Sequence, residues 1–366
     1  MNTNMKENKP VSLADLGWNS FFEKHYQIMK IPDSMPARVI SESRGSFQLY
    51  YQYGELSARL SGKMRYHAGE DQYPAVGDWV MVNPLVEEKK GIIHAVLPRK
   101  SKFSRKVSGE RTEEQIVSTN VDTVFIVGGL DGGRSFNLRR IERYLTLAWN
   151  SGATPVIVLN KIDLCDNIDF YMHSVESIAA GVAIHPVSAR QKTGLSALRG
   201  YLPRGNTAAF LGSSGVGKSA LINALLGMEK QLTAEVREDD RTGRHTTTSR
   251  QLILLPGGGI VIDTPGMREI QLWAGEEDLQ GTFQDIEVLA EQCRFADCGH
   301  TAETGCAVKA AIDRGELDPA RLDSYQRLQN ELKYLAAREA HSTRQYEKLR
   351  WKKIAKWSKE LKKRPL

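Results

Sequence analysis

Hydrophobic and polar positions along the chain follow two patterns, and the change between them divides the sequence. Apolar residues first recur in short runs separated by glycine and polar turns, at 37–43, 46–53, 55–62, 77–83 and 91–97. Several short runs at close spacing are typical of a small closed β-barrel, of the OB or SH3-like kind. We therefore expect a barrel over residues 36–104.

A second pattern begins at Val121, where apolar runs alternate with helical stretches. Strand-like runs occupy 121–130, 154–163, 181–189 and 207–212, and helix-like runs occupy 138–152 and 217–227. This alternation favours a mostly parallel sheet with helices on both faces. Two further strands joined by a Pro-Gly turn are expected within 251–266, and the chain then becomes helical and charged.

Three other segments complete the predicted organisation. The stretch 13–30 has the pattern of a short amphipathic helix, with Leu16, Trp18, Phe21 and Phe22 available for packing. The polar, basic stretch 98–115 suggests a linker. The expected boundaries are an N-terminal extension at 1–35, a barrel at 36–104, an α/β domain at 110–271 and a helical domain with a basic tail at 272–366.

One glycine-rich segment carries a phosphate-binding motif. Residues 212–219 match G-x-x-x-x-G-K-[S/T] at every fixed position, between a strand-like and a helix-like run. Glycines let consecutive backbone N–H groups point at phosphate oxygens, and the helix that follows adds its positive end. Lys218 would bridge the β- and γ-phosphates, and the Ser219 hydroxyl would bind Mg²⁺. A glycine-rich turn before a structural helix is the weaker alternative. The predicted nucleotide contacts are Gly212, Ser213, Ser214, Gly215, Val216, Gly217, Lys218 and Ser219.

A second motif, Asn160-Lys161-Ile162-Asp163, indicates which base is bound. It follows the apolar run 155–159, at the carboxyl end where open α/β sheets bind ligands. The Asp163 carboxylate can accept hydrogen bonds from N1–H and the exocyclic amine of guanine, whereas adenine has no such donor pair. Asn160 would fix the loop and touch N7 or O6, and the Lys161 stem would lie along the ring. A second segment, with Ser188 and Ala189, would read O6.

The order of these motifs is rotated relative to an ordinary GTPase, because the base loops precede the phosphate loop. The segment 263–266 matches D-x-x-G, so Asp263 would contact Mg²⁺ through water and the Gly266 N–H would sense the γ-phosphate. The segment 237–250 is the expected switch I, where Thr247 is the favoured Mg²⁺ ligand among three threonines. Every element is present in cyclically permuted order, so we infer a circularly permuted GTPase domain.

The residue that orients the attacking water is not obvious. Met267 follows the D-x-x-G motif, and a thioether cannot hold water as a glutamine does. Intrinsic hydrolysis is therefore expected to be slow. His245 could orient the water once switch I closes around GTP; the alternative is an exposed loop histidine without a catalytic role.

Three of the four cysteines lie within fourteen residues. Together with one histidine they follow the spacing C-x4-C-x-H-x5-C, formed by Cys293, Cys298, His300 and Cys306. Three thiolates and an imidazole make a complete tetrahedral set for one structural Zn²⁺. Unrelated buried thiols are the alternative, because the spacing departs from the common C-x2-C knuckles.

Charge is concentrated at the end of the chain. Residues 321–366 contain fourteen Lys and Arg against five Asp and Glu, a net of +9, so the remaining residues sum to −3 for a total of +6. Trp351 and Trp357 interleave the basic residues. RNA contact is therefore favoured there over a merely solvated helix face or a membrane-surface helix. No run is long and apolar enough to span a membrane, and no secretory signal is recognisable, so a cytoplasmic protein is expected.

Taken together, these motifs resemble the ribosome small-subunit-dependent GTPase A family (RsgA/YjeQ). The resemblance covers nearly all of the chain after about residue 36. It implies an N-terminal OB barrel, a permuted GTPase domain and a C-terminal zinc module. It also implies late maturation of the small (30S) ribosomal subunit, contact with its 16S rRNA, and GTP hydrolysis stimulated by that subunit. His245 is similar to the proposed catalytic histidine of the family.

Two features set limits on this resemblance, and two rival functions remain open. Residues 36–97 carry equal numbers of acidic and basic side chains, so charge does not indicate RNA binding by the barrel. Residues 1–35 have no counterpart that we can assign.

One rival function is an RNA-binding assembly scaffold in which nucleotide is structural, and the other is a GTPase acting on another RNA or partner. A monomer that binds GTP and GDP, away from membranes, is expected.

Overall fold

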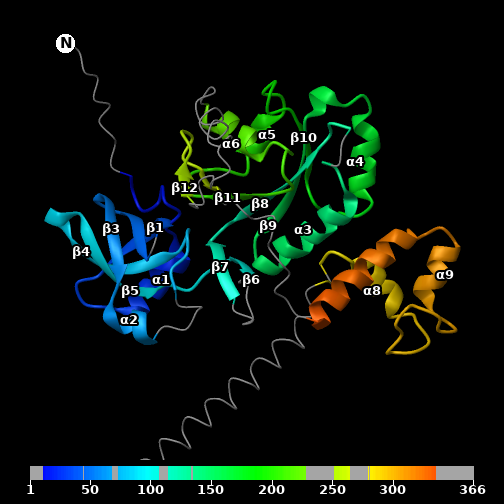
Figure 1. Cartoon of the computed structure of the whole chain (residues 1–366), viewed down its shortest axis with the longest axis horizontal. Coiled ribbons are helices and arrows are strands. Elements are labelled where there is room, and N and C mark those ends of the chain that lie inside the picture. The colour runs from blue at the N-terminus through cyan, green and yellow to red at the C-terminus, as the bar shows by residue number, and fades with distance from the viewer. Residues whose placement is uncertain are drawn as a thin grey trace, which may run out of the picture. The chain divides into compact units, whose positions relative to one another are not determined.

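The computed structural model describes residues 11–43, 45–67, 73–106, 114–132, 135–227, 251–263, 279 and 281–334. The chain forms two compact units, Met1–Ser104 with Ile116–Ile270, and Arg105–Gln115 with Gln271–Leu366. The first unit contains the barrel and the α/β domain (Figure 1), and the second contains the cysteine cluster.

The five predicted barrel strands are confirmed. They are β1 (Met35–Ser43), β2 (Ser46–Tyr51), β3 (Gly54–Leu60), β4 (Trp79–Leu85) and β5 (Lys90–Val96). Their order is β1-β2-β3-β5-β4, and β4 also pairs with β1, which closes the barrel. Only the β3–β5 pairing among these is parallel. Five strands in a closed Greek-key arrangement form an OB-like barrel.

Apolar side chains at alternating strand positions fill the barrel. The buried cluster includes Val39, Phe47, Leu49, Val80 and Ile93. Their neighbours along each strand point outward, as the two-residue period of a strand requires. Between β3 and β4 the short helix α2 (Gly62–His67) contributes Met64 to this core.

The α/β domain has the predicted parallel sheet. Its strands are β8 (Thr123–Gly129), β9 (Thr154–Asn160), β10 (Ile184–Val187), β11 (Thr207–Leu211), β12 (Gln251–Leu254) and β13 (Ile260–Asp263). They lie in the order β10-β9-β8-β11-β13-β12, and all pairings are parallel except that of β12 with β13. The strand that leads into the phosphate loop, β11, is therefore central, beside β8.

Helices cover both faces of this sheet (Figure 1). Phe125 and Val127 of β8 share a buried cluster with residues of α5 (Leu195–Arg199) and α6 (Lys218–Leu226). Gly128, which points to the other face, lies against Ile141 of α3 (Leu138–Ser151). The amide of Asn137 caps α3 and Gly152 ends it in the left-handed conformation, as expected for helix termini. Helix α4 (Ile168–Glu176) precedes β10.

The barrel and the α/β domain share one continuous sheet. Strand β1 pairs with β12 at Ser41 and Gln251, so eleven strands are joined in a row. Sequence patterns do not predict this pairing, because it joins residues about two hundred positions apart. Gln251 follows directly on the segment predicted as switch I, whose residues lie outside the described part of the chain.

The N-terminal segment packs on the barrel. The predicted amphipathic helix forms as α1 (Ser20–Met29), although residues 13–17 before it make turns. Leu16 and Phe22 are fully buried in a cluster with Trp79 of β4, and Trp18 packs against the same cluster. The apolar residues that the helical pattern singled out therefore do line a core.

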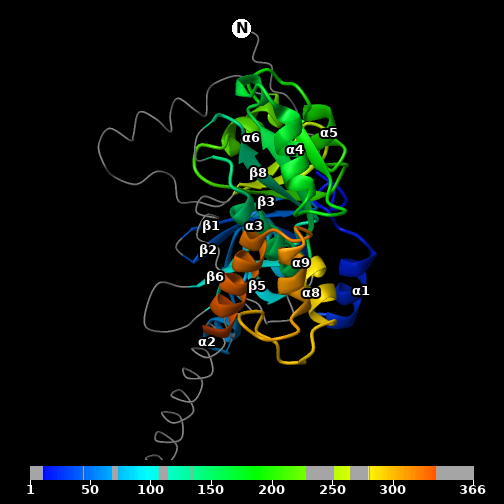
Figure 2. The same cartoon turned by 90° about the vertical axis from the view of Figure 1, so that its right-hand side faces the viewer.

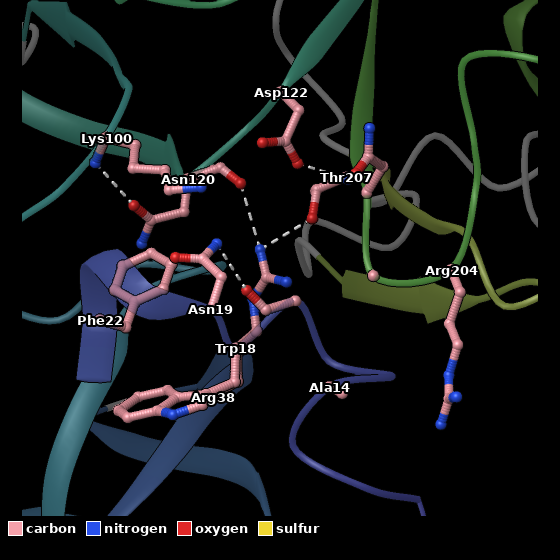
Figure 3. Close-up of a pocket in the computed structure, with 13 residues that line it drawn as sticks. Ala14, Trp18, Asn19, Phe22, Arg38, Lys100, Asn120, Asp122, Arg204 and Thr207 are labelled. Carbon is pink, nitrogen blue, oxygen red and sulfur yellow. Dashed lines mark hydrogen bonds between the residues drawn. The ribbon is translucent and has the colours of Figure 1, made fainter.

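Arg38 joins three parts of the first unit (Figure 3). This β1 side chain is 2% exposed and donates hydrogen bonds to the carbonyls of Leu16, Gly77 and Asn120 and to the hydroxyl of Thr207, where β11 begins. Burial lowers the pKa of Arg38 to about 10. A cavity of about 140 Å³ lies beside it.

The prediction of a linker at 98–115 is wrong in part. Residues Lys102–Lys106 and Glu114–Thr119 form strands β6 and β7 of a separate two-stranded sheet. The side chains of Phe103 and Ser104 are buried despite the basic neighbours that made the segment look solvated. The pairing of β6 with β7 orders this segment, and composition does not reveal such a pairing.

Residues 281–334 of the second unit form helices joined by turns (Figure 2). Helices α8 (Gln284–Ala290) and α9 (Ala307–Asp313) pack together, and residues 319–334 are helical as well. Phe283, Ile286 and Val308 form its buried centre. Among the described residues of the whole chain, no helix is both long enough and apolar enough to cross a bilayer.

Candidate nucleotide site and metal centre

The phosphate loop connects β11 to α6 as the sequence predicted. Gly212, Gly215 and Gly217 all have positive φ angles, of 153°, 81° and 98°. Side chains at such angles are strained, which explains why glycine is found at these three turns. The Lys218 Nζ donates to the carbonyls of Gly212 and Ser213, at 2.8 Å each. The lysine therefore lies over the phosphate loop. The N-terminus of α6 faces the same loop, and a helix N-terminus favours a bound anion.

Asn160 ties the base loop to the phosphate loop. This residue ends β9 and is 2% exposed, and its Nδ2 donates to the carbonyl of Val216 at 2.8 Å. The backbone N–H of Ala189 donates to the Oδ1 of Asn160 at 3.1 Å. A Cβ on Gly217 would lie only 2.2 Å from that Nδ2, so glycine is required for this approach. One amide thus joins three loops that the sequence places in rotated order.

Asp163 and Ser188 are also brought together. The Ser188 hydroxyl donates to Asp163 Oδ1 at 2.6 Å and accepts from the Gln191 N–H at 3.0 Å. This fixes the half-buried carboxylate beside the segment with Ala189. A carboxylate held in this way is suited to accept from the paired donors of guanine.

Asp263 lies at the end of β13, near Lys218. Burial raises the pKa of this carboxyl group, and the positive charge of Lys218 opposes that rise. A half-buried carboxylate next to the phosphate loop is the kind of oxygen ligand that Mg²⁺ takes in nucleotide sites. Ser219, the other described candidate ligand, is exposed on the first turn of α6.

Three predicted site residues, His245, Thr247 and Gly266, lie outside the described part of the chain. Asp131 was not singled out from the sequence, yet its carboxylate contacts the Lys161 ammonium at 2.5 Å. A lone acidic residue after a strand gives no sign of a partner thirty residues away. The G-G-L-D-G-G context could only have marked it as part of a turn.

The second unit gathers the predicted metal ligands. One ligand atom from each of Cys293, Cys298, His300 and Cys306 lies within 4.8 Å of the others. The two sulfurs of Cys293 and Cys306 are 3.9 Å apart, and each lies near the His300 Nδ1, at 3.7 and 3.5 Å. A tetrahedral zinc site with ordinary bond lengths separates sulfur from sulfur by about 3.8 Å and sulfur from nitrogen by about 3.5 Å. The donor set fits such an ion.

The surroundings of the cluster also suit thiolate ligands. Backbone N–H groups of Ala307 and Lys309 donate to the sulfurs of Cys293 and Cys306, at 3.3 and 3.4 Å. Both donors belong to the first turn of α9, whose N-terminus favours negative charge. Burial lowers the pKa of His300, and this favours the neutral imidazole that binds metals.

The fold and these loops together define a class of protein: a circularly permuted P-loop GTPase with a barrel before it and, after it, a helical unit whose three cysteines and one histidine could hold a metal ion. A family model described as RsgA GTPase matches residues 96–273. A protein of Opitutus terrae named "Small ribosomal subunit biogenesis GTPase RsgA" is 46% identical over 354 residues, which cover 94% of this chain and 96% of that protein. The chain belongs to the RsgA GTPase family.

Solved structures agree with this assignment. YjeQ from Thermotoga maritima matches with a TM-score of 0.63 and 30% identity, over 82% of this chain and 98% of that one. YloQ, described as a circularly permuted GTPase, matches with a TM-score of 0.59 and 24% identity, over 82% of this chain and 95% of its own. The second likeness concerns the fold alone. Together with the strand order, these matches confirm the permuted fold that the motif order predicted.

Proposed function

We propose that this chain is a GTPase that binds the small ribosomal subunit, assists its late maturation and hydrolyses GTP faster when bound to it. The observation that carries the proposal is the Asn160 amide, which joins the base loop to the phosphate loop. The chain is also 46% identical, over nearly its whole length, to a protein named for small ribosomal subunit biogenesis.

In this proposal the described loops divide the work of holding GTP. Asp163 accepts from the guanine donors, while the Ala189 N–H and Ser188 complete the base site. Lys218 and the N–H groups of residues 212–219 hold the phosphates. Ser219 and Asp263, with Thr247, hold Mg²⁺, which neutralises phosphate charge when bound. His245 orients the attacking water, and the Gly266 N–H senses the γ-phosphate.

The remaining parts of the chain would serve docking. We propose one structural zinc ion at Cys293, Cys298, His300 and Cys306, since four protein ligands leave no open position for chemistry. The basic tail within residues 321–366 would contact 16S rRNA through its lysines and arginines. We propose an N-terminal extension at 1–35, a barrel at 36–104, a GTPase domain at 110–271 and a helical domain with a basic tail at 272–366. We also propose that the protein is a cytoplasmic monomer.

The direct test measures phosphate release from GTP with and without purified small subunits. We expect slow release from the protein alone and a clear increase when subunits are added. Lys218→Ala should abolish the increase, because the phosphates lose their cation. Lys24→Ala, which removes an exposed lysine of α1, is the matched control and should behave as wild type.

Two results would contradict the proposal in different ways. If small subunits left the rate of GTP hydrolysis unchanged, the proposed action on the ribosome would be excluded, and a GTPase with another partner would be favoured. If Lys218→Ala bound subunits and supported their maturation as well as wild type, nucleotide would be structural, and the chain would be an RNA-binding scaffold.

A further inference from the structure

The loop that follows β8 is fastened to the base loop at two points. The backbone N–H of Leu130 donates to the carbonyl of Asn160 at 2.8 Å. One residue later, the Asp131 Oδ2 lies 2.5 Å from the Nζ of Lys161, and the Ser135 hydroxyl donates to the same oxygen at 3.2 Å. The loop after β8 therefore holds both the backbone and the lysine side chain of the base loop.

This ion pair is not an ordinary surface contact. The Lys161 and Asp131 side chains are 26% and 21% exposed, so water screens them less than it screens open surface pairs. The backbone of Lys161 is also in the left-handed region, at φ 67°, which a residue other than glycine adopts at a cost. The fold thus fixes the direction of the lysine backbone, and Asp131 fixes the far end of its side chain.

The same loop borders the phosphate loop. A Cβ on Gly129 would lie 3.4 Å from the Cα of Val216, so the end of β8 lies close to the segment whose carbonyl accepts from the Asn160 amide. Asp131 is therefore placed where the base loop, the phosphate loop and the loop after β8 meet. A charge at this point can act on the base site without touching the phosphates.

We propose that Asp131 is a positioning residue for guanine nucleotides, which holds the Lys161 ammonium so that the methylene stem stays along the face of the base. The inference rests on the proposed guanine site and adds the residue that orders it. A free lysine side chain samples many rotamers and loses that freedom when a base packs on it. Asp131 removes most of this loss before the nucleotide arrives, which strengthens binding by pre-organisation.

The test is a double-mutant cycle on GDP affinity, measured by calorimetry on the full chain. Asp131→Asn keeps the size and the acceptor oxygen but removes the charge, and we expect it to weaken GDP binding by about tenfold, the scale of a lysine's rotamer entropy. Lys161→Met keeps an apolar stem without the ammonium. In the Lys161→Met background, Asp131→Asn should have no further effect, because its action passes through the lysine.

Controls separate this role from a general structural one. Asp166→Asn removes a nearby exposed carboxylate and should leave GDP affinity unchanged. Should Asp131→Asn fail to fold, Ser135→Ala, which removes one donor to the same oxygen, replaces it in the cycle with a smaller expected loss. Wild-type affinity in Asp131→Asn, or the same loss in both backgrounds, would overturn the inference. Wild-type protein that binds no GDP would instead overturn the proposed function.

Discussion

Replacing one of the four proposed zinc ligands should unfold the second unit while the first unit stays folded. Cys306→Ser removes a thiolate that is 6% exposed and lies 3.5 Å from the His300 Nδ1. A structural zinc ion contributes about 10–16 kcal/mol in small zinc-binding peptides at neutral pH. A core of the size described at 281–334 rarely supplies more than about 3–5 kcal/mol by itself. The free energy lost with the ion therefore exceeds the free energy of folding that the helices can provide by themselves.

Hydrogen exchange followed by mass spectrometry can locate this effect along the chain. In Cys306→Ser, peptides from α8, α9 and residues 319–334 should lose protection, whereas peptides from β8 to β11 should exchange as in wild type. Bound zinc should fall from one ion per chain to none. The same pattern should follow when a chelator is added to the wild-type protein.

Cys165→Ser is the matched control, because Cys165 is a half-buried thiol of the first unit that takes no part in the cluster. It should keep both the zinc and the protection. Full protection of α8 and α9 in zinc-free wild-type protein would contradict this prediction, since the helices would then be stable on their own core.

Three further predictions concern the first unit. Gly17→Ala should cost about 1–3 kcal/mol more stability than Gly45→Ala in urea unfolding, because of steric overlap. Both glycines have positive φ, but a Cβ on Gly17 would also meet the backbone oxygen of Gly205 at 2.6 Å, and equal losses would contradict this close approach. The hydrogen bond from Arg204 lowers the pKa of Asp15 far below its ordinary value. The stability that Asp15→Asn loses at pH 7 should therefore shrink as pH falls below about 4, where the carboxylate of the unfolded chain takes up a proton. A stability difference between variant and wild type that does not change with pH would contradict this role of Asp15. Gly217→Ala should weaken GDP binding at least about tenfold, since its Cβ would displace the amide that joins the two loops; unchanged affinity in a binding titration would show that this tie is dispensable.

The parts of the site that the sequence predicts are those fixed by local geometry. The phosphate loop depends on glycines within a few residues of one another, and the base loop depends on four consecutive residues after a strand. Both therefore leave a readable pattern. The cysteine cluster is predictable for the same reason, since its four ligands lie within fourteen residues.

The contacts that hold these parts together are long-range and leave no such pattern. Arg38 occupies a strand position where an arginine suggests solvent, yet it bonds to Thr207, 169 positions away. The pairing of Ser41 with Gln251 joins the barrel to the α/β sheet at a single point. Asp131 finds Lys161 only because two neighbouring parallel strands end at the same edge of the sheet. Tertiary structure decides such contacts, so periodicity and composition could not reveal them.

We infer that a chain with rotated motif order still forms one pocket selective for guanine, through the carboxylate of Asp163. Calorimetric titration of wild type and Asp163→Asn with GDP, ADP and xanthosine diphosphate tests this selectivity. We predict that wild type binds GDP and neither of the others, and that Asp163→Asn loses GDP and gains the xanthine nucleotide, whose 2-oxo group can accept from the new amide. Wild-type protein that holds ADP as tightly as GDP, or an Asp163→Asn variant that keeps its affinity for GDP, would contradict the claim.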